Sequence, residues 1–247
     1  MKWTRDFLVP TGITSVTSED PNFPAARLIN RVRPNRGWRS TSAAQQDIVV
    51  ALAAAVDVAG VALHGANFAS VQVGYGNAGA GPFTDFAGSP FAVNRDADTY
   101  RKLMVDEPVN AGFLRVRIPA QAADDGAGYF ALGTIFVLGS LREFDEADAP
   151  GAPYQRSVGR PYFSAVVGGR EELAPAGDFG SSHHWQRRTK GLGEWYEVAR
   201  GGEDAPLLWF LDRGAREEVY YGRYRGGIQM EHGGVLTAVS LSLNQVT

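Results

Sequence analysis

The sequence of 247 residues contains no cysteine, which excludes disulfides, thiolate metal ligands and a cysteine nucleophile. Long hydrophobic runs are also missing: the longest apolar stretch, Val49–Leu63, is interrupted by Asp57 and is too short to span a bilayer. The N-terminus has no apolar signal segment, so we expect a protein that is made in the cytoplasm and does not insert into membranes. The net charge of −3 gives no reason to expect nucleic-acid binding.

Catalytic and metal-binding motifs are missing as well. The sequence has no G-x-S-x-G, no P-loop and no H-E-x-x-H. His183 and His184 are adjacent, and neighbouring side chains on a strand point to opposite faces, so the two do not readily share a metal. The paired carboxylates are best interpreted as solvated loop charge: Asp124–Asp125, Glu171–Glu172 and Glu217–Glu218. We therefore expect no enzyme, no cofactor and no metal site.

One segment resembles a nucleotide-binding motif. GYGNAG at 74–79 fits G-x-G-x-x-G and follows a strand-like run. That motif needs a helix to begin at its third glycine, because the helix N-terminus holds the pyrophosphate. Two prolines and further glycines follow instead, in residues 80–90. The segment therefore favours a loop between strands over a dinucleotide site.

Short apolar and alternating runs make up most of the first half of the chain. In FLRVRI at 113–118, Leu114, Val116 and Ile118 share one face, and two arginines share the other. Runs of this kind recur about every ten residues between segments rich in Gly, Pro, Asn and Asp, which is typical of a sandwich or barrel. The other predicted strands are 47–52, 56–63, 70–75 and one or two within 129–141.

A segment rich in acidic residues, Ala, Pro and Gly at 143–153 reads as a linker. We therefore predict an all-β protein of two sandwich-like domains, 1–145 and 152–247, the second with a short helix within 191–202. Further strands are predicted at 160–167, 183–189, 206–212, 217–226 and 235–246. The aromatic residues of the second domain are assigned first to the core, then to a protein interface, and last to a ligand platform: Trp185, Trp195, Trp209, Tyr220, Tyr221 and Tyr224.

Two arginine-rich segments are candidate contact sites. In RLINRVRPNRGWRST at 27–41, five arginines surround Trp38, and this pattern fits either a basic binding loop or a piece of scaffold. In YYGRYRGG at 220–227, Arg223 and Arg225 share one strand face. An edge or interface strand with one basic face suits assembly into a ring. The residues assigned to partner or glycan contacts are Arg31, Arg33, Arg36, Tyr221, Arg223 and Arg225.

The first half resembles the discoidin-like (galactose-binding-like, F5/8 type C) β-sandwich. The resemblance is carried by PAARLIN at 24–30, GWRST at 37–41, QDIVVAL at 46–52, VAGVALHGANF at 58–68 and the apolar run at 129–141. It implies that Trp38 is a buried core residue, that Asn67 ends a strand, and that Arg31, Arg33 and Arg36 form a solvent-facing rim. Members of the family often hold calcium in the loop after the helical turn, but two arginines oppose that here.

The second half is similar, in its order of strands and helix, to distal-tail and tail-tip proteins of long-tailed bacteriophages and gene transfer agents. This resemblance implies a structural protein of the virion tail, assembled as a ring homo-oligomer and docked to tail-tube and hub or baseplate proteins, with contact to a host glycan as a further expectation. Two alternatives remain open. One is a non-catalytic carbohydrate-binding module protein; the other is a hydrolase on a β-sandwich scaffold, which requires facing carboxylates in a cleft.

Overall fold

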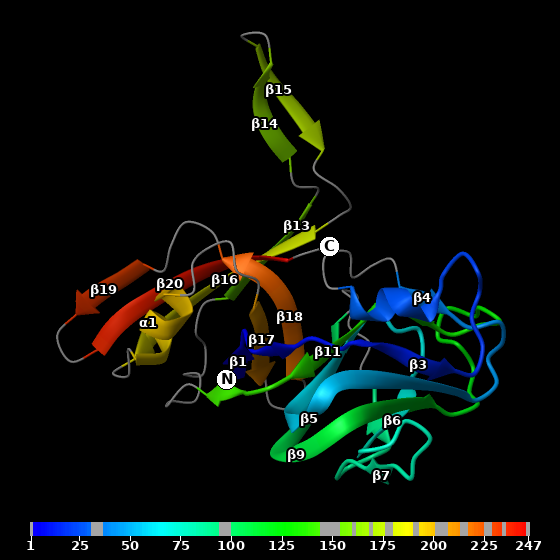
Figure 1. Cartoon of the computed structure of the whole chain (residues 1–247). Coiled ribbons are helices and arrows are strands. Elements are labelled where there is room, and N and C mark those ends of the chain that lie inside the picture. The colour runs from blue at the N-terminus through cyan, green and yellow to red at the C-terminus, as the bar shows by residue number, and fades with distance from the viewer. Residues whose placement is uncertain are drawn as a thin grey trace. The chain divides into compact units, whose positions relative to one another are not determined.

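The computed structural model (Figure 1) describes residues 2–30, 37–93, 100–143, 154–159, 162–167, 170–175, 180–189, 193–200, 207–212, 217–224, 229–233 and 236–245. The chain divides into two compact units. The larger unit comprises Asp6–Leu141 with Asp212–Val219, and the smaller unit comprises Met1–Arg5, Arg142–Leu211 and Tyr220–Thr247. Almost all the regular structure is strand, which confirms the predicted all-β class.

The larger unit is built on a sheet in the order β2-β11-β5-β9-β6-β7, in which β3 also pairs with β5 and β8 with β6. A separate pair, β4 with β10, forms a small second sheet. A 3-10 helix, η1 (Ala25–Ile29), precedes β4. The strands are β2 (Phe7–Leu8), β3 (Gly12–Val16), β4 (Trp38–Arg39), β5 (Gln46–His64), β6 (Ser70–Gly76), β7 (Thr84–Asp85), β8 (Phe91–Ala92), β9 (Tyr100–Ile118), β10 (Ala131–Leu132) and β11 (Thr134–Leu138).

β5 and β9 are each 19 residues long and pair in antiparallel register over most of their length. The sequence predicts two strands here, at 47–52 and 56–63, but the structure joins them into one. The register shifts between Ala51 and Val56, and residues 53–55 are exposed alanines. A bulge of this kind bends a strand without ending it, because pairing resumes on the other side.

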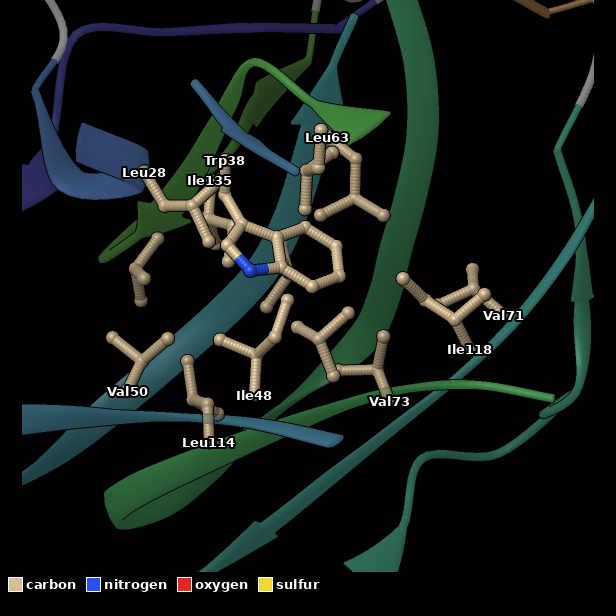
Figure 2. Close-up of a cluster of buried hydrophobic side chains, with 14 of the residues drawn as sticks. Leu28, Trp38, Ile48, Val50, Leu63, Val71, Val73, Leu114, Ile118 and Ile135 are labelled. Atoms are coloured by element: carbon tan, nitrogen blue, oxygen red, sulfur yellow. The ribbon is translucent and has the colours of Figure 1, made fainter. Parts of the chain in front are cut away.

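The core of the larger unit contains the apolar faces that the alternation predicts. Leu114, Val116 and Ile118 are fully buried, which confirms the assignment of that face. Figure 2 shows the Trp38 indole among aliphatic side chains from several elements, including Leu28 of η1. Trp38 is 1% exposed, and its Nε1–H donates to the Ser18 carbonyl at 2.9 Å. The prediction that Trp38 belongs to the scaffold is confirmed.

The smaller unit has a sheet in the order β12-β1-β17-β18-β20-β16-β13, with β19 on β20, and a separate hairpin of β14 and β15. Its one described helix, α1 (Gly193–Arg200), lies within the predicted range, and no helix in the described part of the chain is long and apolar enough to cross a membrane. The strands are β1 (Lys2–Thr4), β12 (Arg142–Glu143), β13 (Tyr154–Gly159), β14 (Tyr162–Val167), β15 (Arg170–Pro175), β16 (Gly180–Thr189), β17 (Leu207–Asp212), β18 (Glu217–Tyr224), β19 (Gln229–Gly233) and β20 (Leu236–Gln245).

The N-terminal strand pairs with the second half of the chain. β1 is antiparallel to both β12 and β17, with Trp3 opposite Arg142 on one side and Trp209 on the other. Met1–Arg5 therefore group with the smaller unit, whereas the sequence-based division assigns them to 1–145. The reason is physical: three residues of strand have little sequence signal, and their hydrogen-bond partners are over a hundred residues away.

The sequence favours an edge or interface strand at 220–227, and the structure contradicts the edge alternative for the part that it describes, β18 (Glu217–Tyr224). β18 lies between β17 and β20, with Arg223 opposite Asn244 of β20. At Gly222, Arg223 and Tyr224 the strand pairs with β20, so this part of β18 offers no free edge for pairing with another copy. Periodicity cannot distinguish an interior strand from an edge strand, because both alternate in the same way.

The N-terminal segment also holds helix α1 in the smaller unit. Trp195 and Val198 of α1 are buried. The Arg5 guanidinium donates to the Val198 carbonyl at 2.7 Å, and the Trp3 indole N–H donates to Glu194 at 3.1 Å. Carbonyls near a helix C-terminus lack partners inside the helix, so a cation placed there both satisfies them and complements the helix dipole.

Candidate functional site

A small group of aromatic and arginine side chains lies on the outer face of the β4–β10 pair. In that pair Trp38 is opposite Leu132, and Arg39 is opposite Ala131. Trp38 and Leu132 are buried, whereas Arg39 and Ala131 are half-buried. Since successive strand residues point to opposite faces, burying Trp38 directs the next residue, Arg39, toward solvent.

Arg39 lies between two aromatic rings. Its guanidinium carbon is 3.7 Å from the centroid of Phe23 and 5.2 Å from the centroid of Tyr129. A second arginine, Arg27 of η1, approaches the same Phe23 ring at 5.7 Å. These distances are within the range of cation–π attraction. We call Phe23, Arg27, Arg39 and Tyr129 the arginine–aromatic stack; all four side chains are half-buried.

Backbone hydrogen bonds fix Phe23 beside Arg39. Asp20 and Phe23 close a tight turn, in which the Phe23 N–H donates to the Asp20 carbonyl at 2.8 Å. The Arg39 N–H donates to the Phe23 carbonyl at 3.1 Å, and the Asp20 N–H donates to the Arg39 carbonyl at 2.8 Å. Pro24 then precedes η1, so Arg27 follows Phe23 by about one helical turn.

Asn67 holds the other side of the stack. Its side-chain oxygen accepts from the Ala131 N–H at 2.7 Å, and its backbone N–H donates to the Ala131 carbonyl at 3.2 Å. Its side-chain amide donates to the Tyr129 carbonyl at 3.1 Å and to both Asp125 carboxylate oxygens at 3.2 Å. Asn67 thus occupies the place of a neighbouring strand along β10 and fixes the segment that carries Tyr129.

The stack carries two positive charges that no carboxylate of the described residues neutralises. Within the described residues, the guanidinium groups of Arg27 and Arg39 make no hydrogen bond and no ion pair. The acidic side chains of the adjoining segments are engaged elsewhere. Glu19 accepts from the Ala25 N–H at 2.7 Å, and Asp20 accepts from the Asn22 N–H at 2.8 Å. The stack is therefore a basic, aromatic surface with free hydrogen-bond donors.

Two other arginines of the larger unit differ from Arg27 and Arg39 because each forms an ion pair with an aspartate. Arg115 pairs with Asp85 at 2.8 Å, and Arg117 donates to Asp47 from Nε at 2.7 Å and from a terminal nitrogen at 3.1 Å. The hydrogen bond to Asp47 raises the pKa of Arg117 above its ordinary value, although burial opposes the shift. A bidentate contact between an arginine and a carboxylate is stronger than a single hydrogen bond between them.

The residues that sequence reasoning assigned to contacts have mixed outcomes. Arg31, Arg33, Arg36 and Arg225 lie outside the described residues. Tyr221 and Arg223 lie on β18, whose backbone is described and whose side chains are not. Their role in partner or glycan contact stays a prediction.

Sequence reasoning missed the arginine–aromatic stack as a site. Arg27 and Arg39 belong to the arginine-rich segment at 27–41 that the sequence indicates as a candidate contact site. Phe23 and Tyr129 were not predicted as site residues. A weak signal existed: Arg39 directly follows a tryptophan that the family pattern assigns to the core, so it has to face outward. Nothing local in the sequence connects Arg39 to Tyr129, which is 90 residues further along.

Two other segments have plain structural roles. The glycines at 74–79 end β6 and lead through a turn to β7, which confirms a loop between strands; the Asn77 side chain there accepts from the Gly112 N–H at 2.9 Å. The Asp125 carboxylate accepts hydrogen bonds from the Asn67 side-chain amide and from the Ala127 N–H, the latter at 3.0 Å, so it stabilises this loop. In the described part of the chain, no three acidic or histidine side chains cluster as metal ligands would.

Part of the larger unit matches a known protein family. Residues 12–131 match the F5/8 type C domain, and this range lies within the larger unit. The first half of the chain therefore holds an F5/8 type C, or discoidin-like, domain, as the resemblance implied. The match does not extend into the second half, and the similarity to phage tail proteins stays a prediction.

Solved structures share this likeness at low identity. The CBM32-3 module of a family 31 glycoside hydrolase from Clostridium perfringens is 15% identical, with a TM-score of 0.44 over 52% of this chain and 90% of that one. Chitosan-binding module 1 from a chitosanase/glucanase of Paenibacillus sp. IK-5 is 19% identical, with a TM-score of 0.43 over 53% and 96%. Reduced XRCC1 bound to the DNA pol beta catalytic domain is 15% identical, with a TM-score of 0.46 over 54% and 99%. No curated protein matches the chain in sequence.

Proposed function

We propose that the F5/8 type C domain of this protein is a non-catalytic carbohydrate-binding module and that the arginine–aromatic stack is its binding surface. The observation that carries the proposal is the pairing of two half-exposed rings, Phe23 and Tyr129, with a guanidinium that has no acceptor among the described residues. Sugars combine an apolar C–H face with a rim of hydroxyl oxygens. Aromatic rings can cover the former, and the five N–H donors of arginine can satisfy the latter.

The rigidity of the stack supports this role. Phe23 and Arg39 are joined through their backbones, and Asn67 holds the segment of Tyr129 with hydrogen bonds to two of its residues. A surface whose side chains are already ordered loses less conformational entropy when a ligand binds. The family match supports the same function, because the family is galactose-binding-like in its fold.

A glycan array on the 247-residue protein, followed by titration of the best ligand, tests the proposal. We expect Tyr129→Ala to reduce affinity by about tenfold or more, because loss of a ring from a packed contact costs on the order of 1–3 kcal/mol. Phe83→Ala is the matched control, since Phe83 also contacts an arginine, Arg115, but lies outside the stack. An array without ligands, or ligands whose affinity is the same for Tyr129→Ala and the native protein, would contradict the proposal.

For the smaller unit we propose a role in assembling a phage tail ring. What supports this second function is that β16, α1, β17, β18 and β20 follow one another in the order of the distal-tail resemblance, with β19 added between β18 and β20. Because β18 pairs with β20 at Gly222, Arg223 and Tyr224, ring contacts would have to use surfaces other than this part of its edge. Native mass spectrometry of the purified protein is the direct test. We expect a closed oligomer of defined size; a protein that stays monomeric at tens of micromolar would argue against ring assembly.

A further inference from the structure

Among the described residues, most arginines that contact an aromatic ring also contact an oxygen acceptor. Arg5 contacts the Trp3 ring and donates to the Val198 carbonyl. Arg142 contacts the same ring and is 3.9 Å from a Glu194 carboxylate oxygen. Arg115 contacts the Phe83 ring and pairs with Asp85.

Arg27 and Arg39 are the exceptions. Among the described residues, they are the ring-contacting arginines whose guanidinium groups have no oxygen acceptor. Both approach one ring, that of Phe23, so their charges lie in the same small area of surface. Two like charges near each other repel, and the repulsion is offset when an anion binds between or beside them. The stack thus has the charge arrangement of an anion site, and no carboxylate in the part of the chain that the structure describes fills it.

We propose that the glycan bound by the stack is acidic: it carries a carboxylate or a sulfate that accepts hydrogen bonds from Arg27 and Arg39, while its sugar ring packs on Tyr129. This inference rests on the proposed carbohydrate-binding function and adds the ligand class. Guanidinium groups bind planar or tetrahedral oxyanions through paired N–H donors, and these charge-assisted bonds are stronger than those to sugar hydroxyls. A neutral sugar leaves both positive charges without a counter-charge.

The test compares acidic oligosaccharides with neutral derivatives of the same sugar backbone. The probes are trigalacturonate with its methyl ester, and a sulfated chondroitin oligosaccharide with its desulfated, carboxyl-reduced form, each titrated into the 247-residue protein. We expect at least one acidic member to bind about tenfold more tightly than its neutral partner. Raising sodium chloride from about 50 to 500 mM should weaken the acidic ligand and leave the neutral one unchanged, since salt screens charge contacts at exposed sites.

Variants then test whether the preference for acidic ligands depends on the arginines of the stack. Arg27→Gln and Arg39→Gln should each reduce affinity for the acidic ligand about tenfold more than they reduce affinity for the neutral one, while Arg27→Lys keeps part of the acidic preference. Arg200→Gln is the charge-matched control, because its side chain is 77% exposed and it lies on α1 of the smaller unit. It should leave both affinities unchanged. Urea unfolding of each variant checks that the domain remains folded.

The outcomes separate this inference from the function on which it rests. Equal or tighter binding of neutral sugars, still lost in Tyr129→Ala, would overturn the acidic class and keep the carbohydrate site. Acidic binding that Arg27→Gln and Arg39→Gln do not change would also overturn it. Tight binding to vesicles of anionic phospholipid, with no acidic glycan bound, would overturn both proposals in favour of a membrane surface. An acidic preference that the stack variants remove supports both.

Discussion

Replacing Trp38 by alanine is the sharpest test of how the F5/8 type C domain is held together. The side chain is 1% exposed and packs with Leu28, Ile48 and Leu63 in the core. Large-to-small changes of a buried tryptophan cost about 3–5 kcal/mol. The loss of the indole N–H bond to Ser18 contributes about 1 kcal/mol of this, because the carbonyl loses its partner. With a denaturant dependence of about 2 kcal/mol per molar urea, the unfolding midpoint should fall by about 2 M.

Hydrogen exchange measured by mass spectrometry across a urea series is the suitable assay, because peptides from β5 and β9 report on the larger unit alone. Trp38→Phe should cost less, about 1–2 kcal/mol, since most of the ring volume stays and the N–H donor is lost. Val9→Ala is the control: Val9 is 67% exposed, so its change should stay within about 0.5 kcal/mol. If Trp38→Ala left the midpoint unchanged and removed glycan binding instead, Trp38 would be a ligand contact and the scaffold assignment would be wrong.

Three further changes test other parts of the fold. Gly37→Ala should destabilise the larger unit by about 2–4 kcal/mol, because a Cβ there overlaps the Leu132 carbonyl oxygen; an unchanged urea midpoint would refute the close approach. Asn67→Ala should cost about 1–3 kcal/mol and weaken glycan binding, because the segment that carries Tyr129 loses its hydrogen bonds; full stability and affinity would show that Asn67 does not fix that segment. Arg5→Ala should speed amide exchange in α1 and cost about 1 kcal/mol, because the Val198 carbonyl loses a donor; unchanged exchange there would count against that cap.

Much of the fold follows from local pattern. The alternation at 113–118 places Leu114, Val116 and Ile118 in the core, and the structure buries all three. The run at 129–141 holds two strands, β10 and β11, as one of the predicted alternatives states. Short strands were missed, including β1 and β3, because two to five residues carry too little periodicity to stand out from loops.

The contacts of the candidate site could not be predicted from local sequence pattern. The sequence indicates the arginine-rich segment at 27–41 as a candidate contact site, but composition does not tell which of its five arginines make contacts. Their roles depend on which residue the fold places beside each. Arg39 faces outward because Trp38 is buried, and this much follows from the sequence and the family pattern together. That Arg39 meets Tyr129, and finds no carboxylate among the described residues, depends on pairing between strands 90 residues apart.

The amino-acid sequence by itself determined the all-β class, the buried role of Trp38 and the discoidin-like character of the first half, because these properties are written in side-chain periodicity and short motifs. Tertiary structure alone decided that β1 joins the sheet of the second half, that β18 is an interior strand, and that Phe23, Arg27, Arg39 and Tyr129 form one surface. The reason is the same in each case. Strand partners and charge neighbours are set by hydrogen bonds and packing between distant segments, and neither alternation nor composition records which segments meet.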